Sequence, residues 1–146
     1  MEPLIRPATP EDFDSLWQLY KLLEVDGDPT VSPREAEHGF TAILARPGHT
    51  IYMAESSGEV VGTYALAFVP GLTHGARDSA IVEDVVVTPD QRGRGVGKWM
   101  MRDALERCRQ RGCYKLALSS HLQREKAHRF YEGLGFSKHG FSFLVA

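Results

Sequence analysis

The feature that most constrains the fold is a β-branched run that passes into a helical pattern through a turn rich in glycine. The run ends at Thr88–Pro89, glycines occupy positions 93, 95 and 97, and apolar residues then recur at helical spacing. Proline lacks an N–H group and ends a strand. Glycine permits positive φ and removes the Cβ that would hold a ligand away from the backbone. The sequence therefore predicts a strand followed by a helix, joined by a turn that another molecule can approach closely.

This turn has the chemistry of a phosphate site. A helix N-terminus offers unpaired N–H groups and the positive end of the helix dipole, and Arg92, Arg94 and Lys98 add positive charge around it. Two common phosphate loops do not fit. The G-x-x-x-x-G-K-[ST] loop would need glycine at Arg92, and the dinucleotide pattern G-x-G-x-x-G would need glycine at Lys98. The remaining spacing is Q-x-x-G-x-G, which begins at Gln91.

Stretches of strand and helix character alternate along the rest of the chain. They predict the order β, α, α, β, β, β, α, β, α, β. That order favours a central mixed β-sheet with helices on both faces, in the α/β or α+β class. The expected strands cover residues 4–9, two runs within 50–70, 79–89, 114–120 and 136–146, and the expected helices cover 10–23, 33–45, 96–111 and 124–135.

Length and composition predict one globular domain over residues 1–146. Of the 146 residues, 42% are hydrophobic and 25% are charged, which argues against disorder. No apolar run approaches the ~20 residues of a membrane span, and the first residues lack the layout of a secretory signal. Cys108 and Cys113 are expected to be free thiols. A reducing, cytoplasmic location is therefore expected.

Positive charge is concentrated around the glycine turn. Residues 91–115 carry eight basic side chains against two acidic ones, although the whole chain has a net charge of −2. Such a patch suits a phosphate-bearing small molecule or a nucleic acid. A solvated helix face is the simpler explanation for Arg107, Arg109 and Arg111. Because the segment has neither a recognition motif nor stacking aromatics between its basic residues, no nucleic-acid partner is expected.

Two motifs resemble those of one enzyme family. The stretch VEDVVVTPDQRGRGVGKWMM, residues 82–101, resembles the acetyl-coenzyme A (acetyl-CoA) motif of the GNAT superfamily of N-acetyltransferases. The stretch AHRFYEGLGF, residues 127–136, resembles the family's second motif, a helix with a tyrosine four residues before Gly-Phe. Chain length and element order match as well. The resemblance implies the GNAT-like acyl-CoA N-acyltransferase fold, with an acetyl group moving from acetyl-CoA to a primary amine by direct attack.

The resemblance also implies where the co-substrate binds. In family members its pyrophosphate lies on the glycine turn, and its pantetheine arm pairs with the motif strand like an added strand. Arg124 occupies a position where many members have asparagine, and it could instead reach a phosphate. Aminoalkylphosphonate acetyltransferases are similar in this region. The implied contacts are Val85, Val86, Val87, Gln91, Arg92, Gly93, Arg94, Gly95, Val96, Gly97, Lys98 and Arg124.

Tyr131 matches the tyrosine whose hydroxyl protonates the departing thiolate in many family members. The alternative is an aromatic side chain that only packs on a buried helix face. For the general base the resemblance indicates Glu83, with a salt bridge or a substrate contact as the alternative. Strand alternation predicts Glu83 on the same face as Val85 and Val87, with Asp84 on the other face.

Other candidates for the base and for a metal are weaker. His74 and His139 are possible alternative bases. No histidine or cysteine pair has the spacing of a zinc site, so no metal is expected. The motif Asp26–Asp28 has an acidic spacing found in calcium loops, but the further acidic ligands are missing, and a turn explains it better.

The acceptor is expected to be a small-molecule amine. Its pocket is expected from residues 21–35, 70–78 and 137–143, where Glu24, Asp26 and Asp28 could attract an ammonium group and Arg77 or His74 an acidic group. Alternatives are a protein N-terminal or lysine acetyltransferase and a non-catalytic CoA-binding sensor or subunit. The resemblance also makes a homodimer possible.

Overall fold

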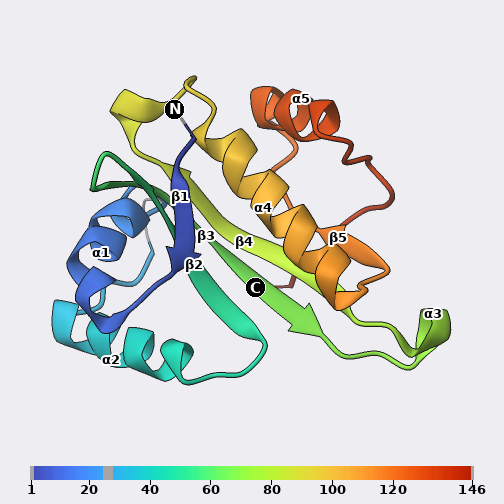
Figure 1. Cartoon of the computed structure of the whole chain (residues 1–146), viewed down its shortest axis with the longest axis horizontal. Helices are drawn as coiled ribbons and strands as arrows, with labels where there is room; N and C mark the ends of the chain where they lie inside the picture. Colours follow the sequence, from blue (N-terminus) through green and yellow to red (C-terminus); the bar gives the residue numbers. More distant parts are fainter. Residues whose placement is uncertain (1, 25–27, 146) are drawn as a thin grey trace.

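The computed structural model describes residues 2–24 and 28–145. Within them, five strands form one mixed sheet in the order β1-β2-β3-β4-β5 (Figure 1). The first four strands pair antiparallel, and β5 is parallel to β4. The strands are β1 Leu4–Pro7, β2 His49–Ser56, β3 Glu59–Val69, β4 Ser79–Val87 and β5 Lys115–Ala117.

Helices cover both faces of this sheet, as the sequence predicts. Figure 1 shows α1 and α2 on one side of the strands and α4 and α5 on the other. Two 3₁₀ turns, Pro10–Asp12 and Pro89–Gln91, precede α1 and α4. The helices are α1 Phe13–Lys21, α2 Pro33–Leu44, α3 Thr73–Ala76, α4 Val96–Arg111 and α5 Glu125–Gly133.

Local signals in the sequence explain where these helices begin and end. Ser32 accepts a hydrogen bond from the Glu35 N–H, and the Glu35 carboxylate accepts one from the Ser32 N–H, so α2 begins with a capping box. Gly112, at φ +77°, ends α4 in the left-handed region that favours glycine. Both boundaries agree with the sequence prediction.

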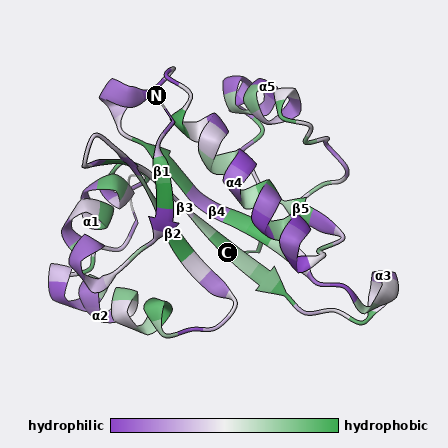
Figure 2. Cartoon of the chain, viewed as in Figure 1, coloured by the Kyte–Doolittle hydropathy of each residue, from purple (hydrophilic) through white to green (hydrophobic). Residues whose placement is uncertain are grey.

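The sheet separates two apolar cores (Figure 2). One core packs α1 and α2 against Ile51, Met53 and Ala65. The other packs α4 against the opposite face, where Tyr64 and Met100 are fully buried. Figure 2 shows hydrophobic strands in the middle and polar residues on the outer sides of the helices. This is the arrangement expected for amphipathic helices on a buried sheet.

A β-bulge interrupts β4 at Asp84. Thr63 on β3 lies opposite Val86, whereas Ala65 lies opposite Glu83, so β4 has one residue more than its partner between these pairs. Asp84 has φ +53°, in the left-handed region. The bulge resets the alternation of side chains.

The sequence prediction for the faces of β4 is therefore wrong. Val82, Val85 and Val87 belong to the core beneath α4, whereas Val86 belongs to the core beneath α1 and α2. Because Glu83 alternates with Val82, it projects toward the α1 side, away from the face that Val85 and Val87 share. The strict period of two fails because the extra residue at Asp84 shifts every residue after it.

Strands β4 and β5 diverge after a short stretch of pairing. Ser79–Ile81 pairs with Lys115–Ala117. Beyond Ile81, β4 continues through Val87 without a partner on that side among the described residues. The main-chain groups of the motif strand are thus open along this edge, as an added extended ligand requires.

Two predicted strands differ from the structure. The strand expected over 114–120 is shortened to Lys115–Ala117, and the segment 71–78, expected to be a loop, contains the short helix α3. The strand expected over 136–146 is not formed within residues 136–145. Its apolar side chains are almost fully exposed, from 86% for Phe141 to 95% for Val145. A strand needs a neighbour for its hydrogen bonds, and this segment has none in the described chain.

Candidate functional site

The glycine turn has an open, left-handed backbone at two positions. Gly93 has φ +77° and Gly95 has φ +90°. A Cβ placed on either residue would meet no atom within 4 Å. The two glycines are therefore needed for their backbone conformation, and the space beside them is free for a ligand.

The start of α4 presents free donors to this space. The N–H of Trp99 donates to the Gly95 carbonyl at 3.0 Å, so the intrahelical hydrogen bonds begin there. Across the described chain, no hydrogen bond is made by the N–H groups of Val96, Gly97 and Lys98, as expected for a first helical turn. With the helix dipole behind them, these groups form an anion site.

Gly97 serves a different purpose from the other two glycines. A Cβ at Gly97 would lie 3.3 Å from the ring of Phe130 on α5. The missing side chain thus lets α5 approach the first turn of α4. Because Phe130 precedes Tyr131, this contact sets how close the candidate acid lies to the glycine turn.

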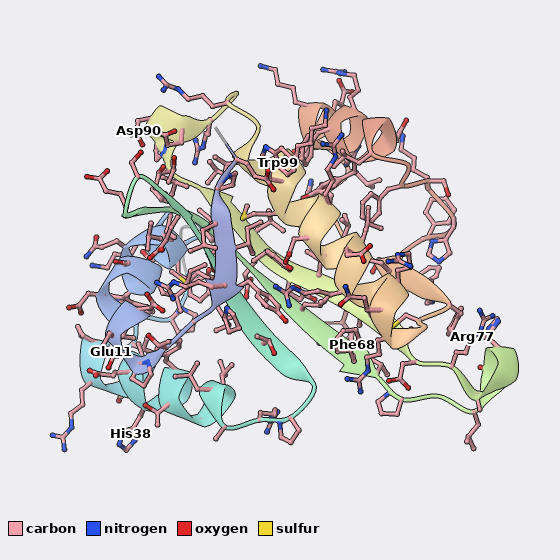
Figure 3. The ribbon with its side chains drawn as sticks, viewed as in Figure 1. Glu11, His38, Phe68, Arg77, Asp90 and Trp99 are labelled. Carbon is pink, nitrogen blue, oxygen red and sulfur yellow. The ribbon has the colours of Figure 1, made fainter. Side chains whose placement is uncertain are left out.

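Charged side chains surround the turn. Figure 3 shows Asp90 and Trp99 on its two sides. The Arg92 Nε donates to the Val87 carbonyl at 3.2 Å and so bridges the turn to the end of β4. Arg94 and Gln91 line a hollow of about 320 Å³ between the turn and the β2–β3 hairpin. The turn thus carries positive charge on its outer side.

Three further arginines of the basic segment pair with acidic side chains. Arg107 pairs with Asp103 at 2.7 Å, Arg109 with Glu106, and Arg111 with Asp78 at 2.9 Å. Arg107 also lies 4.0 Å from the centre of the Tyr52 ring. These contacts support the simpler explanation of the C-terminal half of α4, a solvated face held by ion pairs.

Tyr131 lies on α5, the helix that approaches Gly97 through Phe130. It is half-buried and packs against the core that contains Val85 and Val87. Phe130 and Phe136 hold its ring edge-on, with ring centres 5.2 and 5.8 Å away. Burial raises the pKa of Tyr131, and the positive charge of Arg124 opposes that rise. The structure therefore places Tyr131 near Arg124 and against the same core as Val85 and Val87.

Two exposed carboxylates stand on the motif strand. Glu83 and Asp84 are exposed although β4 lies inside the sheet. Neither forms an ion pair or a side-chain hydrogen bond within the described residues. Asp84 is close enough to Tyr20 on α1 that its negative charge, after burial, raises the pKa of that hydroxyl. Both carboxylates thus project toward the α1 side of the sheet, whereas Tyr131 packs on the α4 side.

The alternative bases are poorly placed. His74 stacks on Tyr114 with ring centres 4.0 Å apart, and its carbonyl accepts a hydrogen bond from Arg77. Both residues belong to the α3 region, at the opposite end of β4 from the glycine turn (Figure 3). His139 lies exposed in the C-terminal segment. None of these residues adjoins Val85.

A second hollow lies on α1. About 340 Å³ of space opens between α1 and the chain leading to α2. Of the predicted acidic residues, Glu24 and Asp28 line it, whereas Asp26 lies outside the described residues. Sequence reasoning missed Tyr20, which faces both this hollow and Asp84. The signal available was its place on an amphipathic helix, which core packing explains equally well.

Metal and membrane features are absent from the described parts of the chain. No three His, Cys, Asp or Glu side chains gather there as metal ligands would. No helix within residues 2–24 and 28–145 has both the length and the apolar character to cross a bilayer.

The model of the Acetyltransferase (GNAT) family matches residues 13–136. The chain belongs to this family. It is 34% identical over 143 residues to the aminoalkylphosphonate N-acetyltransferase of Salmonella typhimurium, covering 97% of this chain and 90% of that protein. It is 42% identical over 89 residues to the glucosamine 6-phosphate N-acetyltransferase of Trypanosoma brucei brucei, covering 61% of this chain and 58% of that protein.

Solved structures support the same fold. A putative acetyltransferase from Agrobacterium tumefaciens str. C58 superposes with a TM-score of 0.91 at 38% identity, covering 98% of this chain and 99% of that one. The predicted GNAT-like fold and the resemblance to aminoalkylphosphonate acetyltransferases are confirmed. The match to the Salmonella typhimurium protein extends over nearly the whole chain.

Proposed function

We propose that the protein moves the acetyl group of acetyl-CoA to the primary amine of a small molecule. The observation that carries the proposal is the glycine turn, with open N–H groups at the start of α4 and unpaired main chain on β4 beside it. The pyrophosphate would accept hydrogen bonds from the backbone of residues 92–98, and the pantetheine arm would pair with Val85–Val87. Arg124 would contact a phosphate.

The reaction is a direct transfer. The amine nitrogen attacks the thioester carbonyl, the main-chain N–H near Val85 stabilises the oxyanion, and the C–S bond breaks. Tyr131 gives its proton to the departing sulfur. An alkylammonium with a pKa near 10.4 is only about one part in a thousand neutral at neutral pH, which costs roughly 4 kcal/mol. Glu83 is the proposed base that removes this proton, through a water molecule.

The acceptor is proposed to carry an anionic group besides its amine. The names of two relatives specify an aminoalkylphosphonate and glucosamine 6-phosphate, and both compounds combine an amine with a phosphorus oxyanion. The hollow on α1 offers charges of both signs, from Lys21 and from Glu24. The free thiols of Cys108 and Cys113 fit a reducing cytoplasm.

Two measurements test this function. Calorimetry should show binding of acetyl-CoA and CoA to the wild type, and weaker binding to Gly95→Val, which strains the left-handed turn. Gly112→Val, at another positive-φ glycine at the opposite end of α4, is the control for backbone strain alone. Thiol release should then follow addition of aminoethylphosphonate or glucosamine 6-phosphate. Folded protein that binds no CoA, or that reacts only with peptides, would contradict the proposal.

A further inference from the structure

Asp84 occupies a backbone conformation that a strand residue seldom adopts. Its φ of +53° falls in the left-handed region, where a residue other than glycine costs roughly 1–2 kcal/mol. The cost is imposed within β4, in the stretch beyond Ile81 that pairs with β3 alone among the described residues. Glycine would remove it. Strained residues of this kind gather at functional sites, where a specific side chain is needed.

The position of the bulge connects Asp84 to the reaction. Asp84 directly precedes Val85, whose side chain packs in the same core as Tyr131. Its carboxylate is exposed and forms no ion pair with the described residues, so no basic side chain among them neutralises it. An unpaired, exposed carboxylate on this open stretch of β4 is available to a cation from outside.

Tyr20 links this carboxylate to the hollow on α1. The Tyr20 ring lines the hollow together with Trp17 and Lys21. Its hydroxyl is near enough to Asp84 to feel that negative charge. Tyr20 thus lines the hollow on α1 and also lies near the Asp84 carboxylate.

We propose that Asp84 binds the ammonium group of the acceptor, with the Tyr20 hydroxyl beside it, and so determines which amines the enzyme accepts. This inference rests on the proposed function and adds a role that differs from that of Glu83. Glu83 removes the proton, whereas Asp84 holds the cation on the motif strand beside Tyr20. Acceptors with a cationic amine would bind, and their hydroxyl analogues would bind poorly.

The test separates binding from chemistry. Asp84→Asn removes the charge but keeps a side chain that tolerates the left-handed region. With aminoethylphosphonate, KM should rise about tenfold to hundredfold, as for the loss of a charge-assisted hydrogen bond. The values of kcat and of the acetyl-CoA dissociation constant should stay close to those of the wild type. Tyr20→Phe should also raise KM, and by less.

Two further variants control for structure. Asp84→Gly relieves the backbone strain, so it should unfold at a higher temperature than the wild type and still show the raised KM. Asp14→Asn removes an exposed carboxylate from α1 outside the hollow. It should change neither the unfolding temperature nor KM. If Asp84→Gly or Asp84→Asn kept the wild-type KM, Asp84 would have no part in acceptor binding. The proposed acetyl transfer would not be contradicted by that result.

A ligand that cannot be acetylated keeps the test independent of activity. The trimethylammonium analogue of aminoethylphosphonate retains the positive charge and has no proton to lose. It should bind the CoA-loaded wild type and bind Asp84→Asn at least tenfold more weakly. This result without any acetyl transfer would support Asp84 and contradict the proposed chemistry. Equal binding to both proteins, or no binding to either, would overturn the inference.

Discussion

The Tyr131 hydroxyl has surroundings that favour its protonated form. Burial raises its pKa, and two phenylalanine rings fix its orientation. Arg124 offsets part of that rise, because its positive charge stabilises the phenolate that remains after proton transfer. A proton donor needs both properties. It must hold its proton at the working pH, and its conjugate base must not be prohibitively unstable.

We therefore expect Tyr131→Phe to lower kcat by about a hundredfold while acetyl-CoA binds as before. The rate of the wild type should fall at alkaline pH as Tyr131 loses its proton, and this fall should be absent from the variant. Since the pKa of Tyr131 is raised, that fall should lie above the ordinary tyrosine value of about 10. A pH profile of kcat measures both effects.

Tyr114→Phe is the control for this experiment. Tyr114 is also half-buried but stacks on His74 near α3. Its variant should keep the wild-type profile. An unchanged kcat in Tyr131→Phe would exclude Tyr131 as the proton donor and leave it only a packing role.

At the scale of elements, α4 and α5 meet at one close contact that sets the geometry of the site. Gly97 on α4 leaves just enough room for the Phe130 ring of α5. Phe130 and Tyr131 are adjacent, so a shift of α5 moves the proposed acid. The spacing of the two helices thus depends on the absence of one side chain.

Gly97→Val should push α5 outward and lower kcat by about tenfold to hundredfold, since displacing a reacting group by about 1 Å costs that much. Phe130→Ala in the same chain should recover part of the loss by making room for the valine. Steady-state kinetics on the single and double variants measure the coupling between the two positions.

Gly39→Val serves as the matched control. Gly39 is also helical and lies on α2, and a Cβ added there would meet no atom within 4 Å. It should change stability only slightly, through helix propensity, and keep its kcat. Equal losses of kcat in both variants would show that the Phe130 contact is irrelevant.

The sequence predicted the elements whose causes are local. The glycine turn follows from positive φ at Gly93 and Gly95, and the start of α2 from the Ser32–Glu35 capping box. These signals need no knowledge of distant contacts. Tyr131 was predicted by the same logic, because its motif fixes its place on a helix.

The bulge and the C-terminal strand could not be predicted in this way. A run such as Glu83–Val87 looks the same with or without an extra residue, because a bulge is defined by the partner strand. The apolar alternation of Phe141, Phe143 and Val145 indicates a strand, but pairing requires a neighbour that the described chain does not supply. The joint position of Tyr20 and Asp84 likewise depends on tertiary packing.

At the scale of the whole molecule, the C-terminal segment leaves apolar surface in solvent. Phe143 and Leu144 are 93% and 92% exposed. Strand β5 is an edge of the sheet and is only three residues long. Exposed apolar side chains and an unpaired edge on the same chain favour association between copies. A homodimer is therefore proposed.

Sedimentation should find the wild type at twice the mass of the chain. The double variant Phe141→Ser, Phe143→Ser should sediment as a monomer, because it loses the apolar surface that would be buried. Leu72→Ser changes a residue that is 92% exposed near α3, so it should remain dimeric. A wild-type monomer, or a double variant that stays dimeric, would exclude association through this segment.

The ion pairs along α4 have a consequence for the approach of acetyl-CoA. Arg107, Arg109 and Arg111 are balanced by acidic neighbours, whereas Arg92, Arg94 and Lys98 have no ion pair within the described residues. Uncompensated positive charge thus lies around the glycine turn, where the nucleotide is proposed to bind. A polyanion diffusing nearby is guided to that end of the helix, so encounters should be frequent in dilute buffer and rarer as dissolved salt screens the attraction.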